Sequence, residues 1–359
     1  MIDDPFDPQL SMFSGENIKA GKRTFNPGVI SSILKHYQQT GFPYIKLTEK
    51  EKEDEFRELQ NLDTNKLVDG KNFISDSTGV ALANSYHPHR YGIVCNDHRT
   101  ALDVFNREDT LRKCIEKCIH MNGKINDSKL RSMLSIFEGV QVASNFPPGT
   151  AKAIYEHLAG PYARVWDMSM GFGGRMIAAM ASRNVVTYYG TDPSTKTFDG
   201  LFRMYQDFLR RQTHGDKYCI LFQSGSEMKL PSNWVDIDFC FTSPPYFNTE
   251  KYAREDTQSF LAYPYQDTWQ RDFLGATFRN CASILKASGR IAINIANVET
   301  FKNLERATVI EAERNGFKLV DTYFLLYTTM PGKGERNRQR GVSGKRKEPI
   351  FIFERRPNW

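Results

Sequence analysis

Apolar and polar positions follow two alternating patterns along most of this chain. From about Ala163 onward, short apolar runs typical of buried strands are separated by longer segments whose apolar residues recur at helical spacing. The apolar runs predict strands over residues 163–168, 187–192, 217–223, 236–243, 290–297, 318–328 and 349–355. The intervening segments predict a helix from Gly174 and helices over about Phe198–Arg211, Tyr265–Lys286 and Phe301–Asn315.

This alternation predicts an α/β fold. Strands separated by helices of this length indicate βαβ units around a largely parallel sheet, here of seven strands. The last two strands follow one another without a helix, which indicates a terminal antiparallel hairpin. Ligands of such sheets bind at the carboxyl ends of the strands, so the residues that end each strand are the candidate site residues.

The chain before this region has a different pattern. A charged run within Ile45–Leu62 predicts a solvated helix, and a second helical block spans about Thr100–Gly139. No catalytic motif is visible there. We therefore divide the chain into a mixed, mainly helical region over residues 1–143, a candidate for target recognition, and a catalytic domain over residues 144–359.

Composition and charge restrict the class of protein only mildly. The chain holds 40% hydrophobic and 25% charged residues, which is ordinary for a globular protein. No apolar run reaches the roughly 18 residues that cross a bilayer, and the acidic N-terminus lacks a secretion signal. We therefore expect a cytoplasmic protein with no membrane partner.

The positive charge is concentrated near the C-terminus. The net charge of +6 permits a polyanionic partner, and the segment Met330–Lys347 is dense in Lys and Arg. These side chains either belong to a solvated loop or contact nucleic-acid phosphates. Their place between the last two strands favours the phosphate contacts. The candidate contacts are Lys333, Arg336, Arg338, Arg340, Lys345, Arg346 and Lys347.

The six cysteines form no CxxC pair and are expected to be reduced thiols. Two ligand sets for zinc are conceivable, namely His87, His89, Cys95 and His98, or Cys114, Cys118 and His120. Cys114 and Cys118 are spaced i, i+4 on the apolar face of a predicted helix, so packing explains them better. We predict no metal site.

The first predicted strand ends in a glycine-rich turn. Asp167 closes the strand, and Gly171, Gly173 and Gly174 follow it. Glycines allow a tight turn and leave no side chain between the backbone and a ligand. The free N–H groups of the next helix then suit a carboxylate or phosphate. A tight turn without any ligand is the alternative.

Acidic and small residues end the second and third strands. Asp192 lies about 20 residues beyond the glycines, where nucleoside-binding α/β folds place a ribose-binding carboxylate. The alternative for Asp192 is a helix N-cap. Ser226 and Glu227, after the third strand, are positioned to border an adenine ring.

The fourth strand ends in Ser243-Pro244-Pro245-Tyr246. Each proline holds the residue before it extended, so the Ser243 hydroxyl and the Pro244 carbonyl are rigid acceptors followed by a flat ring. Two acceptors aimed at an NH2 group favour a pyramidal nitrogen whose lone pair can attack a methyl donor, and they stabilise the charge that develops. Tyr246 offers a stacking face for a base lifted out of its helix. The alternative is a structural proline loop.

The residues after this motif carry a further possibility. Asn248, Glu250, Tyr252 and Gln258 belong to a loop that either closes over a flipped base, with Glu250 near a base edge, or is simply solvated.

Together these motifs resemble those of the DNA amino-methyltransferases, a family of Rossmann-like class I methyltransferases. The family motif D-P-F-x-G-x-G-[TG] is matched by Asp167 and the three glycines, with Met168-Ser169 in place of Pro-Phe. The motif [DNS]-P-P-[YFW] is matched in full by residues 243–246. More loosely, the GFGGR turn, the SPPYF-x-x-E-x-Y stretch and the EPIF-x-F ending resemble DNA-modification proteins of bacteriophage and prophage type.

The resemblance implies S-adenosylmethionine as cofactor and the exocyclic amine of a DNA base as methyl acceptor. It also implies Phe146 and Thr150, from the segment before the glycine turn, as cofactor contacts. Serine at the first motif position favours the N4 amine of cytosine over the N6 amine of adenine.

Two other classes of function stay open. One is an enzyme of the same fold that acts on RNA or on a glutamine side-chain amide. The other is a nucleic-acid-binding partner subunit without catalysis. The basic loop and the large N-terminal region favour nucleic acid over protein, and the presence of both complete motifs favours an enzyme.

Overall fold

The computed structural model describes residues 27–212, 217–327 and 347–357 of the 359-residue chain. Six of the predicted phosphate contacts lie outside the described residues: Lys333, Arg336, Arg338, Arg340, Lys345 and Arg346. In the part that is described, no helix is long and apolar enough to cross a membrane.

The described residues form two compact units. The first, which we call the helical unit, comprises residues 27–46 and 88–143, and the second, the sheet unit, comprises residues 47–87 together with the described residues from 144 onward. The chain therefore passes between the units after Lys46, His87 and Ala143. Part of the region assigned to the N-terminus from sequence, residues 47–87, packs with the sheet.

The helical unit is built around buried faces of short helices. Its elements are α2 (Pro27–Thr40), η2 (Pro88–Gly92), β3 (Val94–Cys95), α5 (Ala101–Phe105), α6 (Glu108–Asn122), α7 (Asp127–Leu134) and η3 (Phe137–Gly139). Cys114 and Cys118 of α6 are fully buried in its core beside Leu111 and Ile115. The packing interpretation of these cysteines is confirmed.

The sheet unit contains a nine-stranded sheet of order β1-β2-β10-β11-β9-β7-β4-β5-β6. The strands are β1 (Val68–Asp69), β2 (Asn72–Ile74), β4 (Ala163–Asp167), β5 (Val185–Thr191), β6 (Tyr218–Phe222), β7 (Ile237–Thr242), β9 (Leu285–Asn294), β10 (Phe317–Leu326) and β11 (Lys347–Arg355). A further short strand, β8 (Glu250–Lys251), lies outside this sheet.

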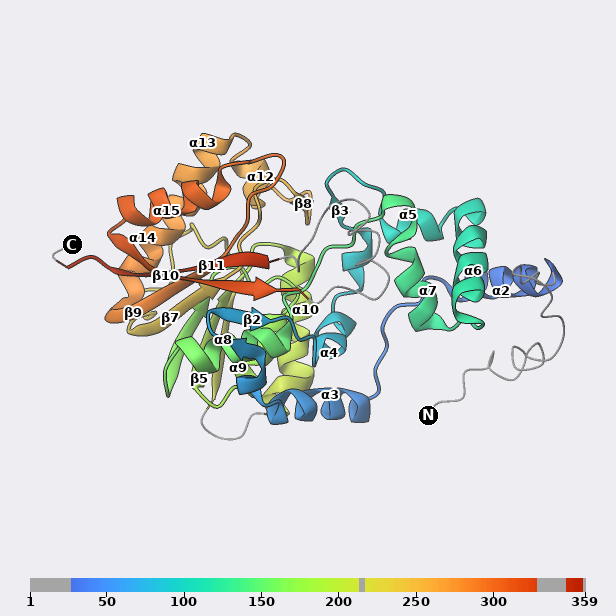
Figure 1. Ribbon diagram of the computed structural model, residues 1–359, viewed down its shortest axis with the longest axis horizontal. Helices are drawn as coiled ribbons and strands as arrows, with labels where there is room; N and C mark the ends of the chain where they lie inside the picture. Colours follow the sequence, from blue (N-terminus) through green and yellow to red (C-terminus); the bar gives the residue numbers. More distant parts are fainter. Residues whose placement is uncertain (1–26, 213–216, 328–346, 358–359) are drawn as a thin grey trace. The chain divides into compact units, whose positions relative to one another are not determined.

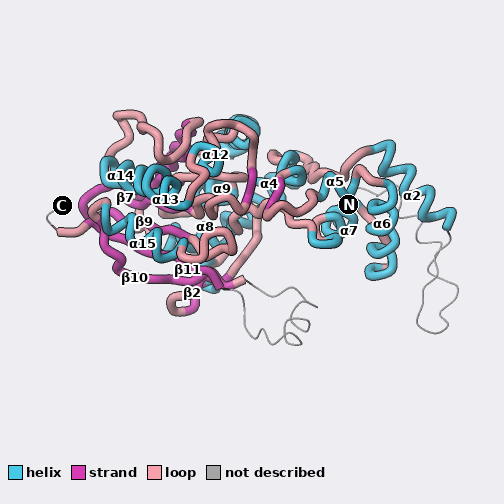
Figure 2. The backbone as a smooth tube through the Cα atoms, turned by 90° about the horizontal axis from the view of Figure 1, so that it is seen from above, coloured by secondary structure: helices cyan, strands magenta, loops and turns pink. Residues whose placement is uncertain are grey.

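The seven strands of this sheet from β4 onward, which exclude β8, confirm the predicted fold. Strands β6, β5, β4, β7 and β9 are parallel neighbours in the order of doubly wound sheets, and β11 runs antiparallel between β9 and β10. This is a Rossmann-like α/β fold with a terminal antiparallel hairpin. The β1–β2 hairpin, which the sequence pattern did not predict, extends the sheet beside β10 (Figure 2).

Helices cover both faces of the sheet (Figure 1). They are α3 (Glu49–Asn61), η1 (Thr64–Leu67), α4 (Val80–Ser85), α8 (Pro148–Leu158), α9 (Gly174–Ala181), α10 (Thr195–Met204), η4 (Tyr205–Leu209), α11 (Arg210–Gln212), α12 (Ser259–Ala262), α13 (Gln266–Thr268), η5 (Trp269–Leu274), α14 (Gly275–Ile284) and α15 (Leu304–Arg314). Successive strand residues such as Val165 and Trp166 belong to two different cores, one under α8, α9 and α10 and the other under α14 and α15. Because successive residues face different cores, both faces of each strand are apolar and the strands appear in the sequence as continuous apolar runs.

Three predicted helices differ from the observed ones. The charged helix starts at Glu49, where Thr48 forms a capping box, and it buries Phe56 and Leu59 instead of being fully solvated. The helix over 198–211 includes the π-turn η4. The helix over 265–286 is interrupted by the π-turn η5 and gives way to β9 at Leu285, so Gly289 lies inside a strand. The π-turn η5 presents Trp269 to the core under α14, which a regular helix pattern does not reveal.

Candidate active site

The glycine turn and the proline motif lie at the same edge of the sheet. They follow β4 and β7, which pair as parallel neighbours through Trp166 and Cys240. Both loops border one small pocket with a volume of about 10 Å³, roughly the room that one water molecule needs. Its lining comprises Met168, Ser169, Ser226, Thr242, Pro244, Phe273, Leu274, Thr277, Phe278 and Ile293.

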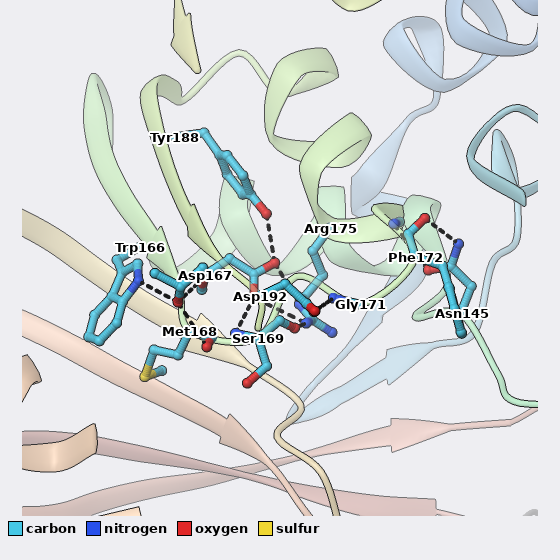
Figure 3. Close-up of polar contacts among 12 residues, drawn as sticks. Asn145, Trp166, Asp167, Met168, Ser169, Gly171, Phe172, Arg175, Tyr188 and Asp192 are labelled. Carbon is cyan, nitrogen blue, oxygen red and sulfur yellow. Dashed lines mark hydrogen bonds and ion pairs between the residues drawn. The ribbon is translucent and has the colours of Figure 1, made fainter. Parts of the chain in front are cut away.

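A buried ion pair supports the glycine turn from beneath (Figure 3). The Asp167 carboxylate accepts hydrogen bonds from Arg175 Nε (2.9 Å) and Nη2 (3.1 Å) and from Tyr188 Oη (2.8 Å). Arg175 also donates to the Ser169 carbonyl. Asp167 is 0% exposed and Arg175 4%. Asp167, predicted as a cofactor contact, therefore has both oxygens engaged in holding the turn.

The glycine turn packs closely against the side chain of Asn145 and the backbone of Phe146. Gly171 and Gly173 have φ values of +56° and +78°, which glycine adopts without strain. The Gly174 N–H donates to Asn145 Oδ1 at 3.0 Å, and Asn145 Nδ2 donates to the Phe172 carbonyl at 3.0 Å. A Cβ atom at Gly174 would lie 2.2 Å from the Phe146 carbonyl oxygen. Only glycine fits at position 174.

Phe146 and Thr150 have different surroundings. The Phe146 ring lies 5.5 Å from the Arg175 guanidinium carbon and packs edge-on against Phe241. The Thr150 hydroxyl donates to the Ile74 carbonyl (3.0 Å) and accepts from the Asp76 N–H (2.8 Å). Thr150 is fully buried, and its hydroxyl ties α8 to the end of β2.

Asp192 joins the second strand end to the glycine turn. Its Oδ2 accepts from the Gly171 N–H at 2.9 Å and its Oδ1 from the Ser194 N–H at 3.1 Å. Burial raises the pKa of Asp192 to about 7, although these two N–H groups oppose the shift. The helix N-cap alternative is wrong, because α10 has Ser194 as its N-cap residue. The first N–H of α10 donates instead to Glu255.

Ser226 and Glu227 end the third strand in different ways. The Ser226 hydroxyl pairs with Thr277 Oγ1 at 2.7 Å, and the residue is buried. Burial raises the pKa of Glu227, and its Oε2 atom is buried without a hydrogen-bond partner among the described residues. An unpartnered buried carboxylate oxygen is costly unless a ligand donates to it.

The proline motif is linked to the far end of the chain. Ser243 Oγ donates to Tyr246 Oη at 3.4 Å, and Tyr246 Oη donates to Glu348 Oε2 at 3.3 Å. Tyr246 Oη also lies 3.3 Å from the Asn294 carbonyl oxygen. Burial, and then the Glu348 charge, raise the pKa of Tyr246 well above its usual value. Pro244 is buried against the pocket, and Pro245 is half-buried.

Tyr246 is followed by a residue in an unusual conformation. Phe247 has a φ of +58°, which is strained for an aromatic residue. Its buried ring packs between Trp269 and Phe301, with centroid distances of 6.0 and 5.8 Å. Such strain persists only where packing imposes it, and it is concentrated at functional sites.

Several polar atoms on either side of the motif are buried without partners among the described residues. They are Thr242 Oγ1, Asn248 Oδ1, Thr249 Oγ1 and Gln258 Nε2. Glu250, predicted to reach a base edge, instead accepts a hydrogen bond from the Tyr252 hydroxyl. The loop after the motif is mostly half-buried, and Gln258 at its end is only 4% exposed.

Sequence reasoning missed five residues of this site: Asn145, Arg175, Tyr188, Asn294 and Glu348. Arg175 directly follows the glycines and Glu348 opens the EPIF segment, so both lay next to a visible motif. The only predicted phosphate contact that the structure describes is Lys347, whose Nζ lies 4.1 Å from the centroid of the Phe324 ring.

Comparisons with known proteins give fold-level neighbours. No family model matches the chain, and no curated protein matches it. Solved structures similar to it include a methyltransferase from Pyrococcus furiosus (12% identity, 62% of this chain and 92% of that one, TM-score 0.37). Another is a TehB-like SAM-dependent methyltransferase from Corynebacterium glutamicum (12% identity, 57% of this chain and 87% of that one, TM-score 0.34). A third is Aeropyrum pernix fibrillarin with bound S-adenosyl-L-methionine (11% identity, 56% of this chain and 73% of that one, TM-score 0.33). The fold assignment rests on the strand order and orientation described above.

Proposed function

We propose that this protein transfers a methyl group from S-adenosylmethionine to the exocyclic amine of a base in DNA, with the N4 amine of cytosine favoured. The observation that carries this proposal is the shared pocket. Met168 and Ser169 of the glycine turn and Pro244 of the proline motif line it together. A methyl donor held by the first loop and an amine held by the second would meet at this edge of the sheet.

The residues at this edge suit the cofactor. A Cβ atom at Gly171 would meet nothing within 4 Å, Asp192 reaches the turn, and Glu227 Oε2 lacks a partner among the described residues. We assign these residues to the cofactor, with Asp192 toward its ribose hydroxyls and Glu227 toward its adenosine half. The bound cofactor supplies an electrophilic methyl group on a sulfonium.

The proline motif suits an amine as methyl acceptor. The Ser243 hydroxyl and the Pro244 carbonyl accept the two N–H hydrogens, which turns the nitrogen lone pair away from the ring system. Preorganised acceptors stabilise the positive charge that develops on nitrogen during transfer. The Tyr246 ring contributes a stacking face for an extruded base, worth roughly 1–3 kcal/mol.

Other features favour a nucleic-acid base over a protein side chain. Within the described part of the chain, Asn248 Oδ1 and Gln258 Nε2 are an unpartnered acceptor and an unpartnered donor, which match the mixed hydrogen-bonding edge of a base. The basic segment before β11 provides phosphate contacts, which add affinity without sequence information.

The test is to incubate the protein with unmethylated DNA and S-adenosylmethionine and to identify the nucleosides by mass spectrometry. We expect N4-methylcytosine, and N6-methyladenine would correct the base. Parallel incubations use RNA and a glutamine-containing peptide, and transfer to either one alone would contradict the DNA assignment. Ser243→Ala should lose transfer while still binding the cofactor. Ser283→Ala, an exposed serine on α14, is the matched control.

A further inference from the structure

Glu348 is a buried carboxylate that the proposed transfer reaction has not yet used. It is the second residue of β11 and is 4% exposed. Its Oε2 atom accepts hydrogen bonds from Tyr246 Oη at 3.3 Å and from Tyr327 Oη at 3.0 Å. Burial of a charged carboxylate costs free energy, so such a group is kept where its contacts compensate. Glu348 contacts the proline motif although it lies 102 positions from Tyr246 in the chain.

The antiparallel insertion of β11 explains this meeting. Strand β11 pairs with β9, and Ile350 stands opposite Asn294 at the end of β9. Asn294 Nδ2 donates to the Pro349 carbonyl at 3.0 Å, and its own carbonyl oxygen lies 3.3 Å from Tyr246 Oη. The start of β11 is therefore fixed beside the end of β9, whose other neighbour is β7, and Tyr246 reaches across to Glu348 to form the hydrogen-bond chain Ser243–Tyr246–Glu348.

Methylation of an amine leaves a proton to be removed. When the N–C bond forms and the S–C bond breaks, the electron pair of the S–C bond stays on sulfur and the nitrogen becomes a cation with two hydrogens. One of them must leave to give the neutral methylamine. The hydrogen bonds from Ser243 to Tyr246 (3.4 Å) and from Tyr246 to Glu348 (3.3 Å) point in the direction such a proton would take.

We propose that Glu348 is the terminal acceptor of this proton through a relay of two hydroxyl groups. The nitrogen gives its proton to Ser243 Oγ, Ser243 passes its own to Tyr246 Oη, and Tyr246 passes its own to the Glu348 carboxylate. Glu348 becomes a carboxylic acid and releases the proton to solvent before the next turnover. This inference rests on the proposed function and adds to it the exit route of the proton.

The test compares Glu348→Gln and Tyr246→Phe in single-turnover methyl transfer. Glutamine keeps an acceptor oxygen, and phenylalanine keeps the stacking ring, but neither relays a proton. General base catalysis contributes about 10²–10⁴-fold, of which water can replace a part. We expect each variant to lower the transfer rate at least tenfold with unchanged substrate KM. The double variant should lose no more than Tyr246→Phe alone.

Controls separate the relay from folding. Glu354→Gln, on the same strand and paired with the exposed Arg290, should keep the wild-type rate. Thermal melting and cofactor binding verify that each variant folds. Should Glu348→Gln not fold, Tyr246→Phe decides alone. A wild-type rate for either folded variant, or losses that multiply in the double variant, would overturn the relay.

A second readout needs neither cofactor nor activity. Burial and then the Glu348 charge raise the pKa of Tyr246, so removal of that charge in Glu348→Gln should let the Tyr246 phenol ionise at lower pH. Alkaline absorbance titration measures this, with Tyr246→Phe identifying the signal, and an unchanged titration would contradict the coupling. If the unaltered protein methylates no amine, the proposed function fails and the relay with it. If it methylates DNA and Glu348→Gln is equally fast, only the relay fails.

Discussion

Arg175 and Asp167 form a two-bond ion pair across the glycine turn, one from the helix after it and one from the strand before it. The Tyr188 hydroxyl satisfies Asp167 further, and the Ser169 carbonyl accepts from Arg175. With its partners satisfied, a buried polar network rigidifies the backbone around it. The turn is thereby held in shape before any ligand binds.

Replacing Arg175 with Ala should lower the free energy of unfolding by about 3–5 kcal/mol, because it leaves the Asp167 charge buried without its partner. Urea denaturation measures this loss. Arg290→Ala removes the exposed ion pair with Glu354 and should cost less than about 1 kcal/mol. An equal loss of unfolding free energy in the two variants would show that burial of the Arg175–Asp167 pair does not affect stability.

Replacing Gly174 with Ala should weaken cofactor binding and cost about 1–3 kcal/mol of stability, since the new Cβ would overlap the Phe146 carbonyl oxygen. Isothermal titration with S-adenosylmethionine and urea denaturation measure the two effects. Gly160→Ala is the control, because a Cβ atom there would meet nothing within 4 Å and only the positive φ of +78° opposes alanine. Its cost should stay near about 1 kcal/mol with unchanged cofactor affinity. Unimpaired binding by Gly174→Ala would argue against the close approach.

Asp192 should make stability fall as pH rises. Its pKa is raised from 3.8 to about 7 in the folded protein, so between these values the folded state holds the proton more tightly than the unfolded chain. The stabilisation is fully present below pH 3.8 and is lost as pH approaches 7, at up to about 1.4 kcal/mol per pH unit. Asp192→Asn should remove this slope from urea denaturation measured between pH 4 and 7. If the wild-type protein and Asp192→Asn show the same pH dependence of stability, the Asp192 carboxylate is solvated and its pKa is not raised.

Replacing Phe247 with Ala should cost about 3–5 kcal/mol, because it empties the site between Trp269 and Phe301. Turnover should fall as well, since the strained backbone that orients Tyr246 loses its anchor. Denaturation and methyl transfer measure the two effects. Tyr265→Ala, at a side chain that is 70% exposed, should change stability by less than about 0.5 kcal/mol. Wild-type turnover in Phe247→Ala would show that Tyr246 needs no such anchor.

The sheet was predictable because its strands are buried on both faces. Residues such as Val165 and Trp166 enter different cores, which produces apolar runs that a single sequence reveals. The β1–β2 hairpin was not predictable, because its two strands have only two and three residues and only β2 pairs with β10, about 250 positions away. Runs so short carry no periodicity.

The location of the site was predictable, but the partners of each side chain were not. Strand ends in a parallel sheet meet at one edge whatever the loops contain, so Asp167, Asp192 and Ser243 were found together. Whether a polar atom faces a ligand or a neighbour depends on contacts made after folding. Thr150 is an example, since its hydroxyl bonds to the Ile74 segment. Glu348 reaches the motif only through the pairing of β11 with β9.

The repeated passage of the chain between the two units has a practical consequence for protein engineering. Truncation at residue 144 would delete the β1–β2 hairpin and α3, and so would strip the sheet of part of its own core. The side chains of Asn84 and Asn145 are joined at 3.0 Å, so the excursion over residues 88–143 leaves and re-enters the sheet unit at nearly one point. A gene encoding residues 47–87 joined by a short Gly-Ser bridge to residues 144–359 is therefore the rational minimal fragment for crystallisation.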